Sequence, residues 1–262
     1  MADVQAQPKV ELEACEVVAE RGEIAHAEWL DIRRQFLGGS DAAAVCGVND
    51  WKSSLSVWAS KVRGIEQEMT SDMKWGNILE PIIRQEFPEE YAAEAEDTIE
   101  VEEAPQVFRS IAWPFMGANL DGIVTTGKHG RGGLEIKTAN LYQTQYWKEG
   151  ELPRQYYCQV QHYMAVTGLS HFLVVVLLGK RLQWRFVPRN EEYIQRMVRI
   201  EQDFWREYIE NGQMPIPKGL ESDRRVLLHL FPSAEVEETD FPPAIAAMAE
   251  RYDDLRAQIK EF

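Results

Sequence analysis

A short segment of alternating apolar and charged residues places the strongest constraint on how this chain can fold. Residues 132–139 read GGLEIKTA, in which Leu134 and Ile136 alternate with Glu135 and Lys137. Residues two apart in a strand share a face, so the two apolar side chains are expected to enter the core. The two charged side chains then point together to the other side. The segment therefore predicts a strand that holds one carboxylate beside one ammonium.

A second carboxylate is expected close to Glu135. Asp121 lies fourteen residues earlier, in GANLDGIV, on what should be the neighbouring strand of a hairpin. Two carboxylates a few Å apart repel each other unless a cation lies between them. Because no histidine or cysteine is at hand, oxygen-only ligation favours Mg²⁺ or Mn²⁺ over zinc. The alternative is a surface hairpin that carries an ordinary Glu–Lys pair.

The apolar pattern along the rest of the chain predicts an α/β fold, a mixed sheet with helices packed on it. Helical spacing runs from about residue 26 to 63, with one helix that opens at GGSDAAAV and is capped by Ser40 or Asp41. A second helix, MKWGNILEPIIRQEF, should kink at Pro81. The further expected segments are the strands VFRSIAW, FMGANLDGIVTT and GGLEIKT, the helix PRQYYCQVQHYMAVTG, the strands HFLVVVLLG and RLQWRFVP, and a long helix over 189–212.

Charge is distributed unevenly in a chain whose formal net charge is -15. Residues 105–199 carry 12 basic and 6 acidic side chains, a net charge of +6. The flanks are acidic, with 23 acidic and 9 basic side chains over 1–104 and 14 and 7 over 200–262. A basic centre between acidic flanks suits a protein that draws a polyanion to one surface. Ordinary fluctuation in composition is the alternative.

Composition also excludes several classes of protein. No apolar run approaches the roughly 18 residues that a membrane span needs, and the start MADVQAQPKV lacks the order of a signal peptide. A cytoplasmic protein is therefore expected. The three cysteines, Cys15, Cys46 and Cys158, are far apart and show no CxxC spacing, which disfavours a disulfide framework, a zinc site and an iron–sulfur cluster.

The spacing of Asp121, Glu135 and Lys137 resembles the motif of the PD-(D/E)xK nuclease superfamily, although Asn119 and Leu120 stand where the motif has its proline. The resemblance implies a restriction-endonuclease-like core and phosphodiester hydrolysis. A metal would neutralise charge on the phosphoryl oxygens and make a water nucleophilic.

The same resemblance assigns roles to four residues. Asp121, Glu135 and the carbonyl of Ile136 would hold the metal. Lys137 would orient the attacking water or help to deprotonate it. With a pKa near 10, Lys137 would act mainly as a positive charge.

Four stretches occur in the order seen in the YqaJ-like viral recombinases, the group that includes phage lambda exonuclease, and the chain resembles that family. They are WLDIRRQFLGGSDAAAVCGV, WGNILEP, GANLDGIV with LEIKTA, and YYCQVQHYMAVTG. The chain start is polar and acidic with little periodicity, so a loosely ordered N-terminal arm is expected over 1–25. The resemblance covers the nuclease domain expected over 26–212, and a C-terminal extension follows over 213–262.

The resemblance gives four more residues a role. Glu80 would complete a second metal position, Gln159 would reach back to the active site, and Arg33 and Ser40 would bind the terminal phosphate of a DNA strand. Each has a structural alternative: an exposed helical carboxylate for Glu80, a core hydrogen bond for Gln159 and a helix cap for Ser40. For Arg33, the neighbouring Arg34 is the competing candidate.

The family implies a Mg²⁺-dependent exonuclease, with Mn²⁺ able to substitute, that digests the 5′ strand of double-stranded DNA and leaves a 3′ single strand for an annealing protein. It also implies a homo-oligomer, a trimeric ring in lambda exonuclease, encoded by a phage or prophage and working in a bacterial cytoplasm. A structure- or site-specific endonuclease and a silent DNA-binding module are the alternatives. A silent module would be expected to lack part of the acid–lysine set, which is complete here: Glu80, Asp121, Glu135, Lys137 and Gln159.

The C-terminal extension is expected to end in an amphipathic helix, PAIAAMAERYDDLRAQIKEF. Its apolar residues alternate three- and four-residue steps, and such a helix could pack on its own domain, contact another subunit or hold a partner. The chain stops within this pattern, which suggests a shortened form of a longer protein. The stripe consists of Ile245, Met248, Tyr252, Leu255, Ile259 and Phe262.

Overall fold

A computed structural model describes residues 10–140, 145–147, 151–232 and 251. The chain divides into two compact units, Met1–Val226 and Leu227–Phe262. In chain order the elements are β1 (Cys15–Glu20), α1 (His26–Arg34), α2 (Gly39–Val45), α3 (Ser54–Arg63), α4 (Ser71–Ala95), β2 (Ile99–Glu102), β3 (Gln106–Ser110), β4 (Gly117–Asn119), β5 (Gly122–Thr126), β6 (Gly130–Ala139), α5 (Arg154–Thr167), β7 (His171–Leu178), β8 (Arg181–Pro188), α6 (Glu191–Phe204), the π-helix η2 (Trp205–Glu210) and α7 (Glu221–Leu230).

Two sheets organise the first unit. The larger has the strand order β2-β5-β6-β7-β8, and the smaller has the order β1-β3-β4. Within the larger sheet β6 and β7 run parallel, while the other neighbours run antiparallel. The mixed sheet that the sequence predicts is therefore confirmed.

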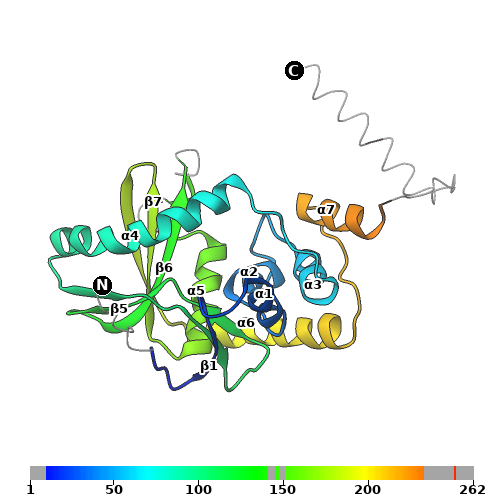
Figure 1. Cartoon of the computed structure of the whole chain (residues 1–262), viewed down its shortest axis with the longest axis horizontal. Helices are drawn as coiled ribbons and strands as arrows, with labels where there is room; N and C mark the ends of the chain where they lie inside the picture. The colour runs from blue at the N-terminus through cyan, green and yellow to red at the C-terminus, as the bar shows by residue number, and fades with distance from the viewer. Residues whose placement is uncertain (1–9, 141–144, 148–150, 233–250, 252–262) are drawn as a thin grey trace, which may run out of the picture. The chain divides into compact units, whose positions relative to one another are not determined.

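Strand β7 shows why helices cover both faces of the larger sheet. Phe172, Val174 and Val176 lie in one buried cluster together with residues of α5 and α6. Leu173 and Val175 point the other way and lie in a second buried cluster with residues of α4. A strand that is apolar on both sides needs such cover on both sides. Figure 1 shows α4 lying across the strands on its side of the sheet.

The expected strand FMGANLDGIVTT is in fact two strands that belong to different sheets. β4 pairs with β3 in the smaller sheet, and β5 pairs with β2 and β6 in the larger one. Leu120 and Asp121 lie at the junction between them. The alternation of residues predicts extended backbone but does not record which strand supplies the hydrogen bonds, so the break was not visible in the sequence.

Most of the expected helices are present, but some are longer than predicted and one is interrupted. α5 starts directly after Pro153 and ends at Gly168, which takes the left-handed conformation with φ 76°. α4 is longer than the pattern predicts and continues past Pro81 and Pro88. The long helix expected over 189–212 changes to a π-helix after Phe204. None of the helices in the described ranges combines the length and the apolar character that crossing a bilayer requires.

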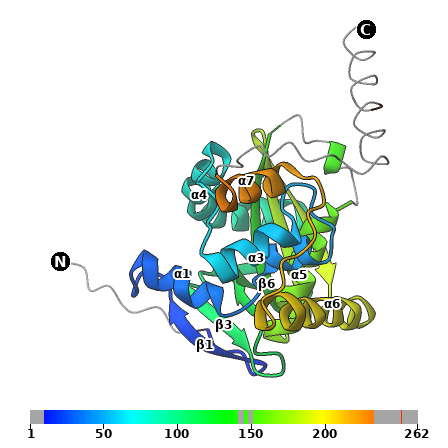
Figure 2. The same ribbon diagram turned by 90° about the vertical axis from the view of Figure 1, so that its right-hand side faces the viewer.

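Part of the loosely ordered arm expected over residues 1–25 is instead a strand of the smaller sheet. Cys15–Glu20 forms β1 and pairs antiparallel with β3, beside which it lies in Figure 2. The partner strand is far away in the sequence, so a search for local periodicity does not detect the pairing.

The apolar stripe expected in the C-terminal helix, from Ile245 to Phe262, consists of residues that lie outside the described ranges.

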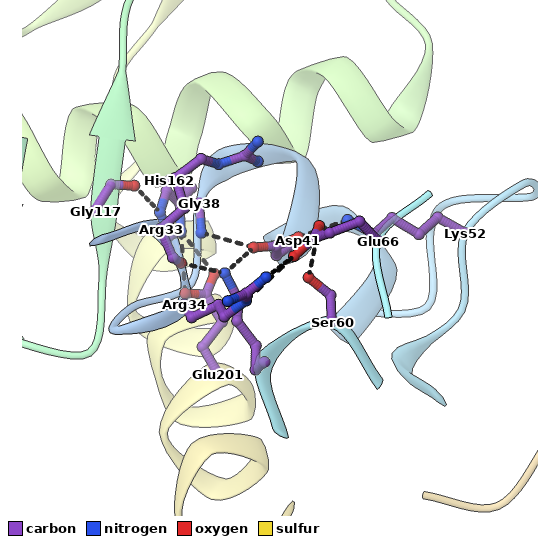
Figure 3. Close-up of polar contacts among 11 residues, drawn as sticks. Arg33, Arg34, Gly38, Asp41, Lys52, Ser60, Glu66, Gly117, His162 and Glu201 are labelled. Carbon is purple, nitrogen blue, oxygen red and sulfur yellow. Dashed lines mark hydrogen bonds and ion pairs between the residues drawn. The ribbon is translucent and has the colours of Figure 1, made fainter. Parts of the chain in front are cut away.

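A fully buried histidine–glutamate pair joins α5 to α6. His162 Nδ1 lies 3.0 Å from each carboxylate oxygen of Glu201, and Nε2 lies 2.9 Å from the carbonyl oxygen of Gly117 (Figure 3). Both ring nitrogens face acceptors, which favours the doubly protonated imidazolium. Burial by itself lowers the pKa of His162, but the Glu201 carboxylate and the Gly117 carbonyl together raise it above the ordinary value.

Replacing one partner of this pair should destabilise the protein strongly. We expect Glu201→Gln to lower the free energy of unfolding by about 3 kcal/mol, because it leaves a buried histidine without its counter-ion. The matched control is Glu192→Gln on the same helix, where Glu192 pairs with Arg196 at the exposed surface. There the loss should stay below about 0.5 kcal/mol. Urea unfolding of both variants compares the two values, and equal losses would contradict the assignment.

The contribution of the pair should also depend on pH. Since the pKa of His162 is raised in the folded protein, its stabilisation is complete below the ordinary histidine pKa of about 6.5. It is lost as the pH rises through the folded-state pKa. Urea unfolding at a series of pH values above 6 should therefore show the gap between the wild type and Glu201→Gln shrinking as the pH rises.

Candidate active site

The hairpin of β5 and β6 brings the predicted acidic residues together. Its register pairs Gly122 with Leu134, so the next position places Asp121 opposite Glu135. Asp121 Oδ2 accepts a hydrogen bond from the backbone N–H of Ile136 at 2.7 Å. Lys137 Nζ lies 2.5 Å from Glu135 Oε1. The side chains of Asp121, Glu135 and Lys137 thus meet at the start of β5, next to its junction with β4.

Glu135 is buried at 2% exposure, and its two carboxylate oxygens have different surroundings. Oε1 accepts a hydrogen bond from Gln159 Nε2 at 2.7 Å, and the same amide nitrogen donates to the hydroxyl of Tyr163 at 3.0 Å. Oε2 is buried but has no hydrogen-bond partner among the described residues. A buried carboxylate oxygen without a partner costs free energy, and a bound cation would remove that cost.

The electrostatics of the site follow from burial and from the closeness of the carboxylates. Burial, and then the nearby charge of Asp121, raise the pKa of Glu135 to about 8. Burial also raises the pKa of Asp121, against the opposing effect of Lys137. Burial alone would lower the pKa of Lys137, but the Glu135 and Asp121 carboxylates raise it. Lys137 is therefore a cation, and the two acids hold their charge only when positive charge is close.

Glu80 approaches this pair from α4. Burial, and then the charge of Asp121, raise its pKa. Its nearest ion-pair partner is Arg84, one turn further along α4, with 3.7 Å between Arg84 Nη2 and Glu80 Oε1. Within the ranges that the structure describes, no three or more His, Cys, Asp or Glu side chains form a group able to hold a metal ion. The acidic donors that lie together here are thus the Asp121 and Glu135 pair, and Glu80 is close enough for its charge to act on both.

The start of α2 is organised by a buried aspartate rather than by Ser40. Asp41 Oδ2 accepts a hydrogen bond from the backbone N–H of Gly38 at 3.1 Å, while Ser40 is exposed. Asp41 also pairs with Lys52 at 2.6 Å (Figure 3) and with Lys61 at 2.9 Å. Burial alone would raise the pKa of Asp41, but these lysines hold it well below its usual value. The N-cap of α2 is Gly38, so neither expected residue holds that position. Asp41, the third residue of the helix, binds the N–H of Gly38, and Ser40 is exposed.

The two adjacent arginines of α1 have different surroundings. Arg34 is engaged by Asp31 at 2.7 Å and by Glu66 at 3.1 Å. The guanidinium of Arg33 lies 4.6 Å from the centre of the Trp29 ring, and no carboxylate of the described residues pairs with it. Arg33 is therefore better placed than Arg34 to receive an anion from outside.

A close approach of α2 to α5 connects these two regions. A Cβ added at Gly39 would lie 2.5 Å from Tyr163 Cε1 and 2.8 Å from Gln159 Cγ. The absence of a side chain at Gly39 is what lets α2 pack against the residues that support Glu135. α2, which contains Ser40 and follows the helix that carries Arg33, thus packs against α5. Gln159 of α5 is the residue that binds Glu135.

Four further residues near the acidic site were not among the predicted site residues. The ring of Tyr156 lies with its centre 4.9 Å from Lys137 Nζ, and Tyr163 binds Gln159. Their spacing in the sequence indicates that both share a helical face with Gln159, but it assigns them no role. Arg84 lies four residues after Glu80, a spacing that also predicts contact. Arg21 donates to the carbonyl oxygens of Ala104 and Leu120, and these contacts give no local signal because the partners are distant in the sequence.

The mixed five-stranded sheet flanked by helices is the architecture of the PD-(D/E)xK fold. The structure is similar to the crystal structure of an alkaline exonuclease, LHK-Exo, from Laribacter hongkongensis, with a TM-score of 0.55 and 22% identity, covering 71% of this chain and 93% of that one. LHK-Exo in complex with dAMP gives a TM-score of 0.52 at 20% identity, covering 72% of this chain and 100% of that one.

The sequence identifies the family. Residues 28–170, more than half of the chain, match the YqaJ-like viral recombinase domain, and the protein belongs to this family. It is also 29% identical over 255 residues to the uncharacterized protein YqaJ of Bacillus subtilis (strain 168), covering 94% of this chain and 76% of that protein. The resemblance stated from the sequence is therefore confirmed, and together family and fold support a nuclease.

The contact between α2 and α5 can be tested with two adjacent glycines. Gly39→Ala should lower the free energy of unfolding by about 1–3 kcal/mol, because the new methyl group overlaps Tyr163 and Gln159. Gly38→Ala is the control, since its Cβ would meet only Asp41 Oδ2, at 3.8 Å. We expect a change below about 0.5 kcal/mol there. Chemical unfolding measures both, and a similar cost for the two variants would refute the close approach.

Proposed function

We propose that this protein is a divalent-metal-dependent exonuclease that degrades the 5′ strand of linear double-stranded DNA and leaves 3′ single-stranded overhangs for recombination by strand annealing. One observation carries the proposal: the buried Glu135 faces Asp121 and retains a carboxylate oxygen that no described residue binds, while Lys137 and Gln159 bind its other oxygen. Membership of the viral recombinase family supports the choice of DNA as substrate.

The donor set suits Mg²⁺ or Mn²⁺. Asp121, Glu135 and the backbone carbonyl of Ile136 would hold the ion, and Glu80 would complete a second position. All of these are oxygen ligands, which hard divalent cations prefer. When bound, such an ion neutralises charge on the phosphoryl oxygens and lowers the pKa of a coordinated water.

The chain's own residues then divide the remaining tasks. The raised pKa of Lys137 keeps its ammonium protonated, so it orients the attacking water and stabilises negative charge on the phosphoryl group rather than accepting a proton. The side-chain amide of Gln159 donates a hydrogen bond that fixes the carboxylate of Glu135. The hydroxyl of Tyr163 accepts a second hydrogen bond from the same amide nitrogen. The ring face of Tyr156 lies next to the ammonium of Lys137 and adds a favourable cation–π contact.

Arg33 and Ser40 would bind the terminal 5′ phosphate of the strand being digested. This is the family assignment, and it is supported by the exposure of Ser40 and by the guanidinium of Arg33, with which no described carboxylate forms an ion pair. Binding of a terminal phosphate would distinguish an enzyme that starts at DNA ends from one that cuts internally.

The proposal extends to assembly and partners. By family resemblance the protein works as a homo-oligomer, in the form of a trimeric ring, in the cytoplasm of a bacterial host, and it hands its single-stranded product to an annealing protein. The basic segment 105–199, at net +6, would then face DNA together with Arg33 and Ser40, and much of the remaining acidic surface would point outward.

Replacing Lys137 tests the catalytic assignment. Lys137→Ala should slow Mg²⁺-dependent digestion of linear duplex DNA by about 100-fold or more, because the positive charge that stabilises the reacting phosphoryl group is lost. Lys180→Ala removes an exposed lysine from the turn after β7 and should leave the rate unchanged. Rates from an end-labelled duplex decide between them. A Lys137→Ala protein with the normal rate would remove the assignment.

The same assay separates an exonuclease from an endonuclease. A covalently closed circular plasmid offers no end, so we expect it to stay intact with Mg²⁺ under conditions that consume the linear form. Cutting of the circle would favour the endonuclease alternative. With EDTA in place of Mg²⁺, neither substrate should be degraded.

End recognition is tested with duplexes that differ only in 5′ phosphorylation and carry distinguishable labels on the two strands. We expect the 5′ strand to shorten, and faster when it is phosphorylated. Arg33→Gln should remove most of that preference, whereas Arg34→Gln should keep it, since Arg34 is held by Asp31 and Glu66. The opposite result would transfer the phosphate-binding role to Arg34.

A further inference from the structure

Two backbone carbonyls at the junction of β4 and β5 receive hydrogen bonds from arginine side chains. Leu120 and Asp121 belong to neither strand. Arg21 Nη2 donates to the carbonyl oxygen of Leu120 at 2.9 Å and to that of Ala104 at 3.1 Å. Arg84 Nη1 donates to the carbonyl oxygen of Asp121 at 2.7 Å. Buried carbonyls outside a sheet need such donors, and here two guanidinium groups supply them.

The two arginines come from separate parts of the fold. Arg21 lies in the turn that follows β1, and its own backbone N–H donates to the carbonyl oxygen of Pro105 at 2.7 Å. Arg84 lies on the inner part of α4, with only 12% of its side chain exposed. Its guanidinium also pairs with Glu80 at 3.7 Å and with Glu103 at 3.4 Å. The side chain of Arg84 thus contacts both Glu80 and Asp121.

These contacts restrain Asp121 from two directions. Its carbonyl oxygen is bound by Arg84, and its carboxylate oxygen Oδ2 is bound by the N–H of Ile136. Because Leu120 and Asp121 lie between the last residue of β4 in one sheet and the first residue of β5 in the other, neither belongs to a strand that would fix its backbone. Without the arginines, the peptide units of the junction could rotate and carry the carboxylate away from Glu135.

We propose that Arg21 and Arg84 are positioning residues that hold the Leu120–Asp121 backbone so that the Asp121 carboxylate faces Glu135 and binds a divalent cation. This inference rests on the metal-dependent function proposed above. Groups that orient metal ligands through hydrogen bonds typically affect metal affinity by about 10- to 100-fold. The role requires arginine, because a planar guanidinium donates in several directions at once, whereas an ammonium is a single point of charge.

The direct test is Mn²⁺ binding to the full chain, followed by electron paramagnetic resonance of the free ion. Arg84→Met and Arg21→Met should each weaken Mn²⁺ binding by about 10- to 100-fold. Arg84→Lys should recover part of the affinity, since an ammonium can donate to the Asp121 carbonyl oxygen but lacks the planar fork that also reaches Glu80. Arg196→Met is the control for Arg84, as Arg196 forms an i,i+4 pair with Glu192 that is exposed.

Arg109→Met is the control for Arg21. Arg109 pairs with Glu16 at 2.5 Å and so also connects β1 to the rest of the smaller sheet, but it contacts no residue of the acidic site. Neither control should change Mn²⁺ affinity. Loss of affinity in Arg109→Met equal to that in Arg21→Met would show a general effect of the β1 region and overturn the positioning role of Arg21.

A second readout separates positioning from loss of structure. Digestion rates measured over a range of Mn²⁺ concentrations should show half-saturation shifted upward by about 10- to 100-fold in Arg84→Met, with the rate at saturating Mn²⁺ close to that of the wild type. Circular dichroism reports whether each variant folds. If Arg84→Met does not fold, Arg21→Met carries the measurement, because it acts on the neighbouring carbonyl from another element.

Failure of this inference and failure of the proposed function give different results. If the wild type binds Mn²⁺ and digests DNA while both methionine variants bind Mn²⁺ as tightly as the wild type does, the positioning role is wrong and the nuclease proposal stands. If the wild type neither binds Mn²⁺ nor digests DNA, both are wrong.

Discussion

The antiparallel register between β5 and β6 is the constraint on which the candidate site depends. It places Asp121 across from Glu135 and directs both toward the space next to Lys137. A shift by one residue would turn Glu135 and Lys137 toward the core and bring Leu134 out, at a large cost in buried apolar surface. The hydrophobic core therefore stabilises the arrangement of charges, because the same strand supplies apolar side chains to one face and ionisable ones to the other.

Three buried carboxylates in this protein show how burial can serve different purposes. Asp41 is matched by Lys52 and Lys61, and Glu201 by His162, so their charges are compensated within the chain. Glu135 is compensated on one oxygen only, and its pKa rises to about 8. Complete pairing indicates a structural role, whereas the incomplete pairing at Glu135 leaves capacity for a ligand.

Much of the site could be predicted from the sequence because its central groups are close together along the chain. The alternation in GGLEIKTA fixes the shared face of Glu135 and Lys137, and the hairpin spacing brings Asp121 close. Gln159 was found through family resemblance, and its hydrogen bond to Glu135 fits that role. The contacts of Arg21, the pairing of β1 with β3 and the division of one expected strand into β4 and β5 were not predicted, since they depend on partners far away in the sequence.

The sequence by itself determined the strand with two faces, the helices with their stops at residues such as Gly168, and the types of side chain available for chemistry. Only the tertiary structure decided which oxygen of Glu135 remains without a partner, which of Arg33 and Arg34 is free of carboxylates among the described residues, and how the Asp121 backbone is held between two sheets. The physical reason is that periodicity along a chain reports local conformation and the direction of side chains. Hydrogen-bond satisfaction and electrostatic pairing depend on distances between segments that only folding brings together.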